Sequence, residues 1–276
     1  MPIRTVNLHS GTEVPALGQG TWHMGDDPAR RDEERNALRA GVDLGMTLID
    51  TAEMYGDGAA ELLVGEAVKG RRDEVFLVSK VLPSHADRYG TVEACRASLR
   101  RLGTDRIDLY LLHWRGSVPL EETVEALESL VRDGSVGAWG VSNLDADDLD
   151  ELPEGAVPET DQILYNLTRR GPEFALFPRC RELSVPLMAY SPVEQGRLLG
   201  HPALGSVASA HGATPAQVAL AWVLRHPDVV AIPKASSAAH VQENRAAAEL
   251  ALTEDDMRLL DDAFPPPTRD RPLEIL

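Results

Sequence analysis

The chain has 276 residues, a length that suits either two domains or one large α/β barrel. Acidic residues outnumber basic ones by 44 to 27, and the net charge of −17 argues against nucleic-acid binding, which depends on Lys and Arg. Apolar residues make up 43% of the chain and charged residues 26%, as is typical of a globular protein that buries a sizeable core.

The two cysteines and the apolar runs exclude further classes. Cys95 and Cys180 lie far apart without a Cys-x-x-Cys or His pairing, so we expect neither a disulfide framework nor a metal site. No apolar run reaches the roughly 18 residues of a membrane helix. Residues 1–6 lack the apolar core of a signal peptide. We therefore expect a cytoplasmic protein with no membrane partner.

Strand and helix patterns alternate along the chain. Residues 5–8 and 13–14 flank a turn and predict a β-hairpin. Apolar runs bounded by turn residues then predict strands at 16–22, 48–50, 75–80, 107–114, 138–143, 162–165, 186–191 and 229–234. Helical periodicity predicts helices at 30–44, 59–69, 91–102, 120–132, 145–149, 174–183, 214–225, 239–248 and 254–263, with a long loop before residue 214 and an irregular tail.

This alternation predicts the architecture. Strands that alternate with helices form a parallel sheet, and eight such units in about 250 residues match the (β/α)8 barrel. A doubly wound sheet is the alternative, but no Gly-x-Gly-x-x-Gly sequence opens a helix, so its usual dinucleotide fingerprint is missing. No linker divides the chain. We predict one (β/α)8 TIM barrel domain over residues 1–276, with an N-terminal β-hairpin and a short C-terminal tail.

Polar side chains gather where four predicted strands end. Asp50 with Tyr55, Lys80, His113 with Trp114, and Ser142 with Asn143 follow successive strands. Each has an ordinary structural explanation, such as a solvated lysine or a core histidine. The carboxyl ends of barrel strands meet around one mouth, however, so all of them together indicate a catalytic site.

The same stretches carry a resemblance to the aldo-keto reductase superfamily, which covers nearly the whole chain. The matching segments are 48–56 with Glu61 and Gly65, Ser79-Lys80, 102–113, Gly140-Val-Ser-Asn143, Ala189-Tyr-Ser-Pro192, and Ile232-Pro-Lys234 with Glu243-Asn244. The resemblance implies an NADPH-dependent reductase in which Asp50, Tyr55, Lys80 and His113 form the catalytic tetrad.

The residue types suit that chemistry. Hydride reduction of a carbonyl needs a proton donor to the oxygen as negative charge develops there, and Tyr55 would be this general acid. A nearby Lys80 ammonium should lower the pKa of the phenol. Asp50 would hold Lys80 in place, and His113 would donate a hydrogen bond to the carbonyl oxygen.

The resemblance also implies a cofactor site that runs across the mouth. Tyr190 would stack on the nicotinamide, and Ser142, Asn143 and Gln162 would bind its carboxamide. Asp50 and the segment Gly20-Thr21-Trp22 would also contact the cofactor. The pyrophosphate loop would contain Ser191, Pro192, Val193, Gln195, Gly196 and Leu198. The adenosine end would be surrounded by Lys234, Ala235, Ser236, His240, Glu243 and Asn244, with Glu243 at the adenine amino group or solvent.

One position departs from the family pattern. Many NADPH-specific members carry an arginine on the 2′-phosphate where this chain has His240, and histidine offers neither a fixed charge nor a two-pronged grip. Ala235 also lacks the hydroxyl often found after the lysine. NADPH remains the expected cofactor, with NADH possible as a second.

The predicted rim bears on the substrate. Trp22, Tyr55, His113 and Trp114 would contact it, and the short loop after His113 and the short tail suggest an open site for a small carbonyl compound. Ala189-Tyr-Ser-Pro192, Ile232-Pro-Lys234 and the Pro-rich tail look most like bacterial members that reduce methylglyoxal and related 2-oxoaldehydes. We expect a monomer that binds a small-molecule carbonyl.

Two other classes stay open. Some barrels of this family are nucleotide-sensing regulatory subunits that can retain the tetrad without significant turnover. A sugar-processing barrel would instead use Asp50, Glu53 and a further carboxylate as acid and base, which leaves Lys80, His113 and Tyr190 without roles.

Overall fold

The computed structural model describes residues 2–276, which contain ten strands and ten α-helices. The strands are β1 (Thr5–Asn7), β2 (Glu13–Pro15), β3 (Gln19–Gly20), β4 (Leu48–Asp50), β5 (Phe76–Val81), β6 (Ile107–Leu112), β7 (Val136–Ser142), β8 (Asp161–Leu164), β9 (Leu187–Tyr190) and β10 (Val229–Ala231). The helices are α1 (Arg31–Asp43), α2 (Ala59–Val68), α3 (Arg88–Leu102), α4 (Leu120–Asp133), α5 (Ala146–Asp150), α6 (Leu176–Leu183), α7 (Pro202–His211), α8 (Pro215–Leu224), α9 (Ala238–Ala247) and α10 (Glu254–Ala263).

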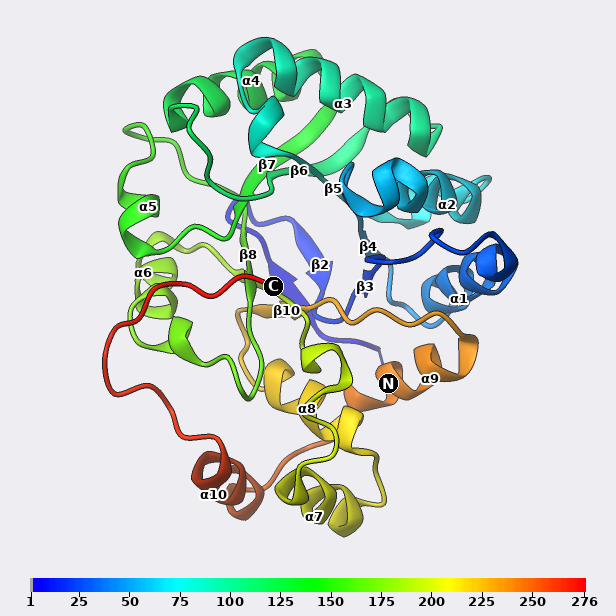
Figure 1. Ribbon diagram of the computed structural model, residues 1–276, viewed down its shortest axis with the longest axis vertical. Coiled ribbons are helices and arrows are strands. Elements are labelled where there is room, and N and C mark those ends of the chain that lie inside the picture. The colour runs from blue at the N-terminus through cyan, green and yellow to red at the C-terminus, as the bar shows by residue number, and fades with distance from the viewer. Residues whose placement is uncertain (1) are drawn as a thin grey trace.

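Strands β3 to β10 form the predicted parallel barrel (Figure 1). They lie in sequence order, and every neighbouring pair is parallel. Parallel bridges from Leu17 to Ala231 and from Gly20 to Lys234 join the first strand to the last. The sheet is therefore closed, which excludes the doubly wound alternative.

The predicted hairpin is also present, and its side chains explain its position. β1 and β2 pair antiparallel. Val6, Leu8 and Val14 are buried in one apolar cluster with Leu109 and Met188 from the barrel strands. The neighbour of Leu109, Tyr110, belongs instead to the larger cluster that the helices cover. Alternate strand residues thus face inward, and the hairpin closes one end of that interior.

The prediction of a long loop before residue 214 is wrong, because this stretch contains helix α7. The sequence of this helix contains Gly205 and several small residues, so large apolar side chains do not recur at the helical spacing that would predict a helix. Pro202 is nevertheless in the first turn, where its missing N–H costs nothing, and Gly212 ends the helix with φ of 60°. Leu204 and Val207 are buried, so the helix is fixed by packing rather than by intrinsic propensity.

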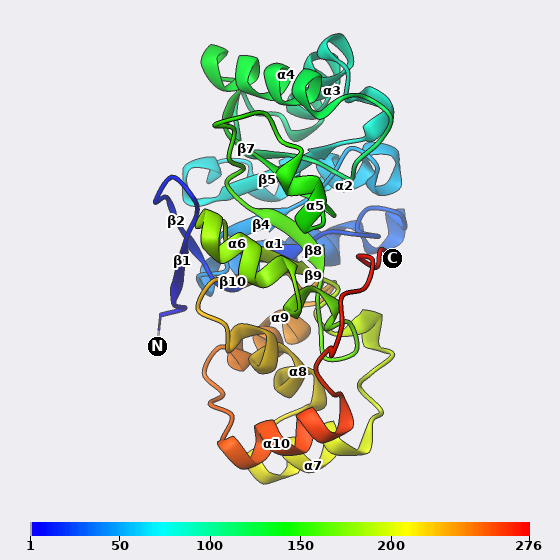
Figure 2. The ribbon, with the colours of Figure 1, turned by 90° about the vertical axis from the view of Figure 1, so that its left-hand side faces the viewer.

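The two termini lie on opposite sides of the barrel. Figure 2 shows the hairpin and the N-terminus on one side and the C-terminus on the other. The tail after α10 crosses the latter side, and in Figure 1 its end lies in front of the barrel centre. Within residues 2–276, none of the helices combines the length and apolar character needed to cross a bilayer.

Asp161 in β8 generates a test of stability. It is fully buried and makes no ion pair within residues 2–276, and burial raises the pKa of its carboxyl well above the usual value. Because the unfolded carboxyl ionises near pH 4, folding becomes less favourable as the pH rises above that value. We expect Asp161→Asn to raise the melting temperature at pH 7.

Thermal unfolding followed by circular dichroism at pH 7 and pH 4 measures this effect. The gain should shrink at pH 4, where the wild-type carboxyl is increasingly protonated in both states. Asp262→Asn removes an exposed carboxylate and serves as the control, with little expected change. An equal or lower melting temperature for Asp161→Asn at pH 7 would contradict the argument.

Candidate active site

The carboxyl ends of β4, β5 and β6 bring four predicted residues to one place. Asp50 ends β4, Lys80 is the penultimate residue of β5, and His113 follows β6. Tyr55 lies on a short turn after β4, where Gly56 and Asp57 have φ of 57° and 52°. The Tyr55 hydroxyl oxygen lies 3.1 Å from the Lys80 ammonium.

Lys80 is the centre of this group. Its side chain is wholly buried, and its Nζ donates to Asp50 Oδ2 at 2.8 Å, to the Thr51 carbonyl at 2.9 Å and to the Tyr55 hydroxyl oxygen at 3.1 Å. An ammonium has three N–H groups, so all three have acceptors. The Tyr55 oxygen accepts from Lys80, which leaves the phenolic proton available to another acceptor.

The charge states follow from burial and from the ion pair. Burial favours neutral Lys80, but the combined effect of Asp50 and Tyr55 outweighs it and raises the pKa of the ammonium. Burial also raises the pKa of Asp50, against the pull of Lys80. For Tyr55 the expected lowering of the pKa is wrong: burial raises it, and the Lys80 charge offsets only part of that rise. Tyr55 is therefore a protonated phenol at neutral pH.

His113 lies edge-on to Tyr55, with ring centroids 5.7 Å apart. Burial and the Lys80 charge lower the pKa of its imidazole to about 2. The ring is therefore neutral at physiological pH and donates through one nitrogen only. Its Nδ1 is buried and has no hydrogen-bond partner within residues 2–276.

Hydroxyl and amide side chains continue the site along β7, β8 and β9. Ser142 Oγ donates to the Gln162 carbonyl at 2.8 Å, and Gln162 Nε2 donates to Asp50 Oδ1 at 2.7 Å. Asn143 Nδ2 donates to the His113 carbonyl at 3.0 Å, and its Oδ1 accepts from the Tyr190 hydroxyl at 2.9 Å. Hydrogen bonds thus connect Asp50 through Gln162 and Ser142 to Asn143 and Tyr190, whereas the part of these residues in cofactor binding stays a prediction.

The loop after β9 holds an unusual backbone. Ser191, Glu194 and Gln195 have φ of 47°, 49° and 55°, a conformation that costs of the order of 1–3 kcal/mol for each residue with a side chain. Glu194 is buried and fixes the loop, since it accepts from Asn166 at 2.8 Å and from Arg169 at 2.9 Å. The other predicted loop residues are Pro192, Val193, Gly196 and Leu198, of which Pro192 and Leu198 are buried and Gly196 is exposed.

The predicted adenosine-end residues lie after β10 and on α9. Lys234 and His240 are exposed, whereas Ala235, Ser236 and Asn244 are buried. Glu243 is partly buried, and its carboxylate accepts from Thr214 Oγ1 at 2.5 Å, at the start of α8; its place at the adenine amino group or solvent stays a prediction. The sequence also missed Glu34, a buried residue of α1 that binds Ser236; its position early in a helix gave no signal.

The rim is more covered than predicted. Gly20 and Thr21 are buried near Asp50, with Thr21 Oγ1 donating to the Asp50 carbonyl at 2.9 Å. Trp22 is 36% exposed and Trp114 half-buried. The tail lies on the side of the barrel opposite the hairpin, and in Figure 1 its end is in front of the barrel centre. A short tail does not imply an open rim, because about 12 extended residues span about 40 Å.

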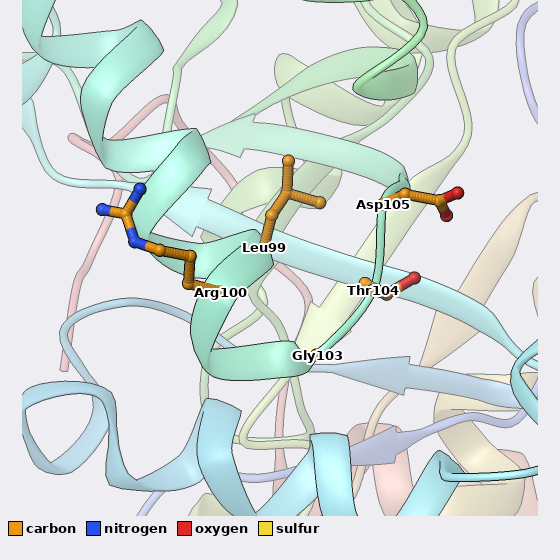
Figure 3. A pocket seen from close by; sticks show the side chains of 5 residues that line it. All are labelled: Leu99, Arg100, Gly103, Thr104 and Asp105. Carbon is orange, nitrogen blue, oxygen red and sulfur yellow. The ribbon is translucent and has the colours of Figure 1, made fainter.

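Other groups of residues fit a site less well. Glu53 accepts from the Leu82 amide at 2.7 Å and contacts His85, while Asp50 is committed to Lys80 and Gln162. This arrangement speaks against an acid–base pair of carboxylates. A surface hollow lined by Leu99, Arg100, Gly103, Thr104 and Asp105 lies before β6, at the strand end away from His113 (Figure 3). Residues 2–276 contain no cluster suited to a metal ion.

The donor set fits a nicotinamide cofactor. Hydroxyl and amide groups of Ser142, Asn143 and Gln162 are of the type that binds a carboxamide. Lys234 offers an exposed ammonium, and α9 begins just beyond it with Ser237 as its N-cap. An ammonium near a helix N-terminus suits a phosphate group.

Comparisons with known proteins agree with this geometry. The model of the family described as "Aldo/keto reductase family" matches residues 16–264. Methylglyoxal reductase YeaE of Escherichia coli (strain K12) is 49% identical over 284 residues, covering 100% of both chains. Glyoxal reductase of Bacillus subtilis (strain 168) is 35% identical over 264 residues, 93% of this chain and 91% of that protein.

Solved structures give the same answer. An aldo/keto reductase from Klebsiella pneumoniae in complex with NADP and acetate is 50% identical, with a TM-score of 0.96 over 99% of this chain and 100% of that one. An aldo-keto reductase from the same organism in complex with NADPH is also 50% identical, with a TM-score of 0.97 over 100% of both. The chain described here belongs to the aldo/keto reductase family.

Proposed function

We propose that this protein is an NADPH-dependent reductase of small carbonyl compounds in which Tyr55 is the general acid. The observation that carries the proposal is the Tyr55 hydroxyl 3.1 Å from a buried Lys80 that is itself paired with Asp50. When bound, the nicotinamide supplies the hydride. The protein's part is to hold the carbonyl and to deliver a proton to its oxygen.

Four side chains divide that work. Tyr55 gives its proton to the carbonyl oxygen as negative charge develops, and the Lys80 ammonium stabilises the phenolate that remains. Asp50 keeps Lys80 charged and oriented. Neutral His113 donates a hydrogen bond to the same oxygen, a role that a buried imidazole can play without carrying a charge.

The remaining polar groups suit the cofactor. Tyr190, fixed by Asn143, would present its ring to the nicotinamide, and Ser142, Asn143 and Gln162 would orient the carboxamide. The strained loop at residues 191–196 would cover the pyrophosphate. Lys234 and the start of α9 would bind the adenosine phosphate. The NADP and NADPH complexes of the Klebsiella pneumoniae proteins support this assignment.

For the substrate we propose a small 2-oxoaldehyde such as methylglyoxal. The relatives named methylglyoxal reductase and glyoxal reductase support this class. A regulatory barrel that binds the nucleotide without turnover is the second candidate, and the names of the two relatives favour the reductase.

The role of Tyr55 is tested by Tyr55→Phe, which keeps the ring and removes the acidic proton. We expect methylglyoxal reduction to fall by about 10²–10⁴-fold, the usual contribution of a positioned general acid. The assay is oxidation of NADPH, followed by its absorbance. NADPH binding, measured by quenching of tryptophan fluorescence, should change little.

Each outcome of that experiment is decisive. Substantial turnover by Tyr55→Phe would remove Tyr55 from the acid role. Binding of NADPH by the wild type without turnover of any small aldehyde would favour the regulatory candidate. Absence of binding would overturn the proposed function altogether.

The pH dependence tests His113. Because the pKa of its imidazole lies near 2, the ring stays neutral from pH 5 to pH 8 and contributes no inflection there. We expect His113→Gln to lower kcat/KM at every pH while leaving the shape of the profile unchanged. A wild-type inflection near pH 6.5 that disappears in His113→Gln would show that the imidazole titrates in this range.

His240 tests the adenosine end. It is exposed in the first turn of α9, close to the proposed phosphate position. Since arginine is always charged and grips phosphate with two donors, His240→Arg should tighten NADPH relative to NADH. Dissociation constants for both nucleotides provide the measurement. Unchanged relative affinities would place residue 240 away from the phosphate.

A further inference from the structure

Glu34 is a buried acidic residue that the catalytic group does not use. It lies in the first turn of α1 and is 2% exposed. Within residues 2–276 it forms no ion pair with any Arg, Lys or His. Acidic side chains are rarely buried unless they are paired, so its position calls for an explanation.

Its two oxygens connect the beginning and the end of the barrel. Glu34 Oε2 accepts from the Gly25 amide at 2.8 Å, in the loop after β3 that also holds Trp22. Glu34 Oε1 accepts from Ser236 Oγ at 3.0 Å, in the loop after β10. The carboxylate therefore lies at the seam where the first strand meets the last, next to the proposed phosphate position.

Several charged side chains near Glu34 influence the Lys234 ammonium. Burial lowers the pKa of the Lys234 ammonium, and Glu34 is the strongest of the charges that raise it, followed among acidic groups by Asp26 and Glu33. Arg30 acts in the opposite direction and lowers this pKa. A phosphate bound by Lys234 would thus feel the charge of three acidic side chains, and of these only Glu34 is buried and shielded from salt.

We propose that Glu34 is a specificity-determining residue that weakens the preference for NADPH over NADH. This inference rests on the proposed function, since it assumes that the cofactor's adenosine end lies at Lys234 and Ser236. Glu34 acts in two ways: its negative charge repels the 2′-phosphate, and its oxygen holds the Ser236 hydroxyl that the phosphate would otherwise use. NADH lacks that phosphate and escapes both effects.

The test is Glu34→Gln, which keeps the size and an oxygen acceptor but removes the charge. Dissociation constants for NADPH and NADH, measured by tryptophan fluorescence in each variant, give their ratio without any need for turnover. We expect the ratio to shift about tenfold toward NADPH, as for loss of one partly screened charge near the phosphate. The affinity for NADH should change little.

Glu33→Gln is the matched control. Glu33 is the preceding residue of α1, but it is exposed and bound to Arg30, so its charge is screened by water and salt. We expect the ratio of the NADPH and NADH dissociation constants in Glu33→Gln to stay near that of the wild type. Glu34→Ser is a second neutral variant, with room for water at the Gly25 amide, in case the glutamine destabilises the fold. Thermal unfolding reports whether each variant is folded.

The possible outcomes distinguish the role of Glu34 from the proposed reductase function. An unchanged ratio in a folded neutral variant would overturn the role of Glu34 while leaving the reductase assignment intact. An equal shift of the ratio in Glu33→Gln would show that the ratio follows the net charge of the protein, and this result would also overturn the specific role of Glu34. Failure of the wild type to bind either nucleotide would instead overturn the proposed function, and this inference with it.

Discussion

The structure of the site depends on one buried charge. Lys80 has no exposed surface, and its partner Asp50 has almost none, so both charges are removed from water. Such a pair is weak evidence for stability, because desolvation offsets much of the attraction. All three N–H groups of the Lys80 ammonium donate hydrogen bonds, however, and the third of these bonds fixes the position of the Tyr55 oxygen. The pair therefore determines where the phenol lies and which way its proton can go.

The surrounding residues extend this arrangement rather than standing apart from it. Gln162 holds the second oxygen of Asp50, and Ser142 holds the backbone of Gln162. Asn143 connects the carbonyl of His113 to the hydroxyl of Tyr190. A continuous hydrogen-bonded series thus runs from β4 to β9 around the mouth, and the groups proposed for catalysis and for cofactor binding belong to it.

Backbone strain is concentrated at the same end of the barrel. Seven residues other than glycine have a left-handed backbone in the part of the chain described, and six of them follow strands at the mouth: His23, Asp57, Asn143, Ser191, Glu194 and Gln195. Each such residue costs free energy and persists only where its surroundings enforce it. Buried Glu194, held by Asn166 and Arg169, is one such constraint.

The sequence alone determined the barrel and placed Asp50, Lys80 and His113 at strand ends, because strand period and strand-end position are local properties. The resemblance to a family then singled out these three and Tyr55 as the predicted tetrad. Tertiary structure decided the rest. Helix α7 is fixed by the packing of its buried residues, and the path of the tail over the barrel is not recorded in its own sequence. Burial also reverses the expected shift in the pKa of Tyr55. Glu34 meets Ser236 only when the barrel closes, since 202 positions separate them and no local pattern records the contact.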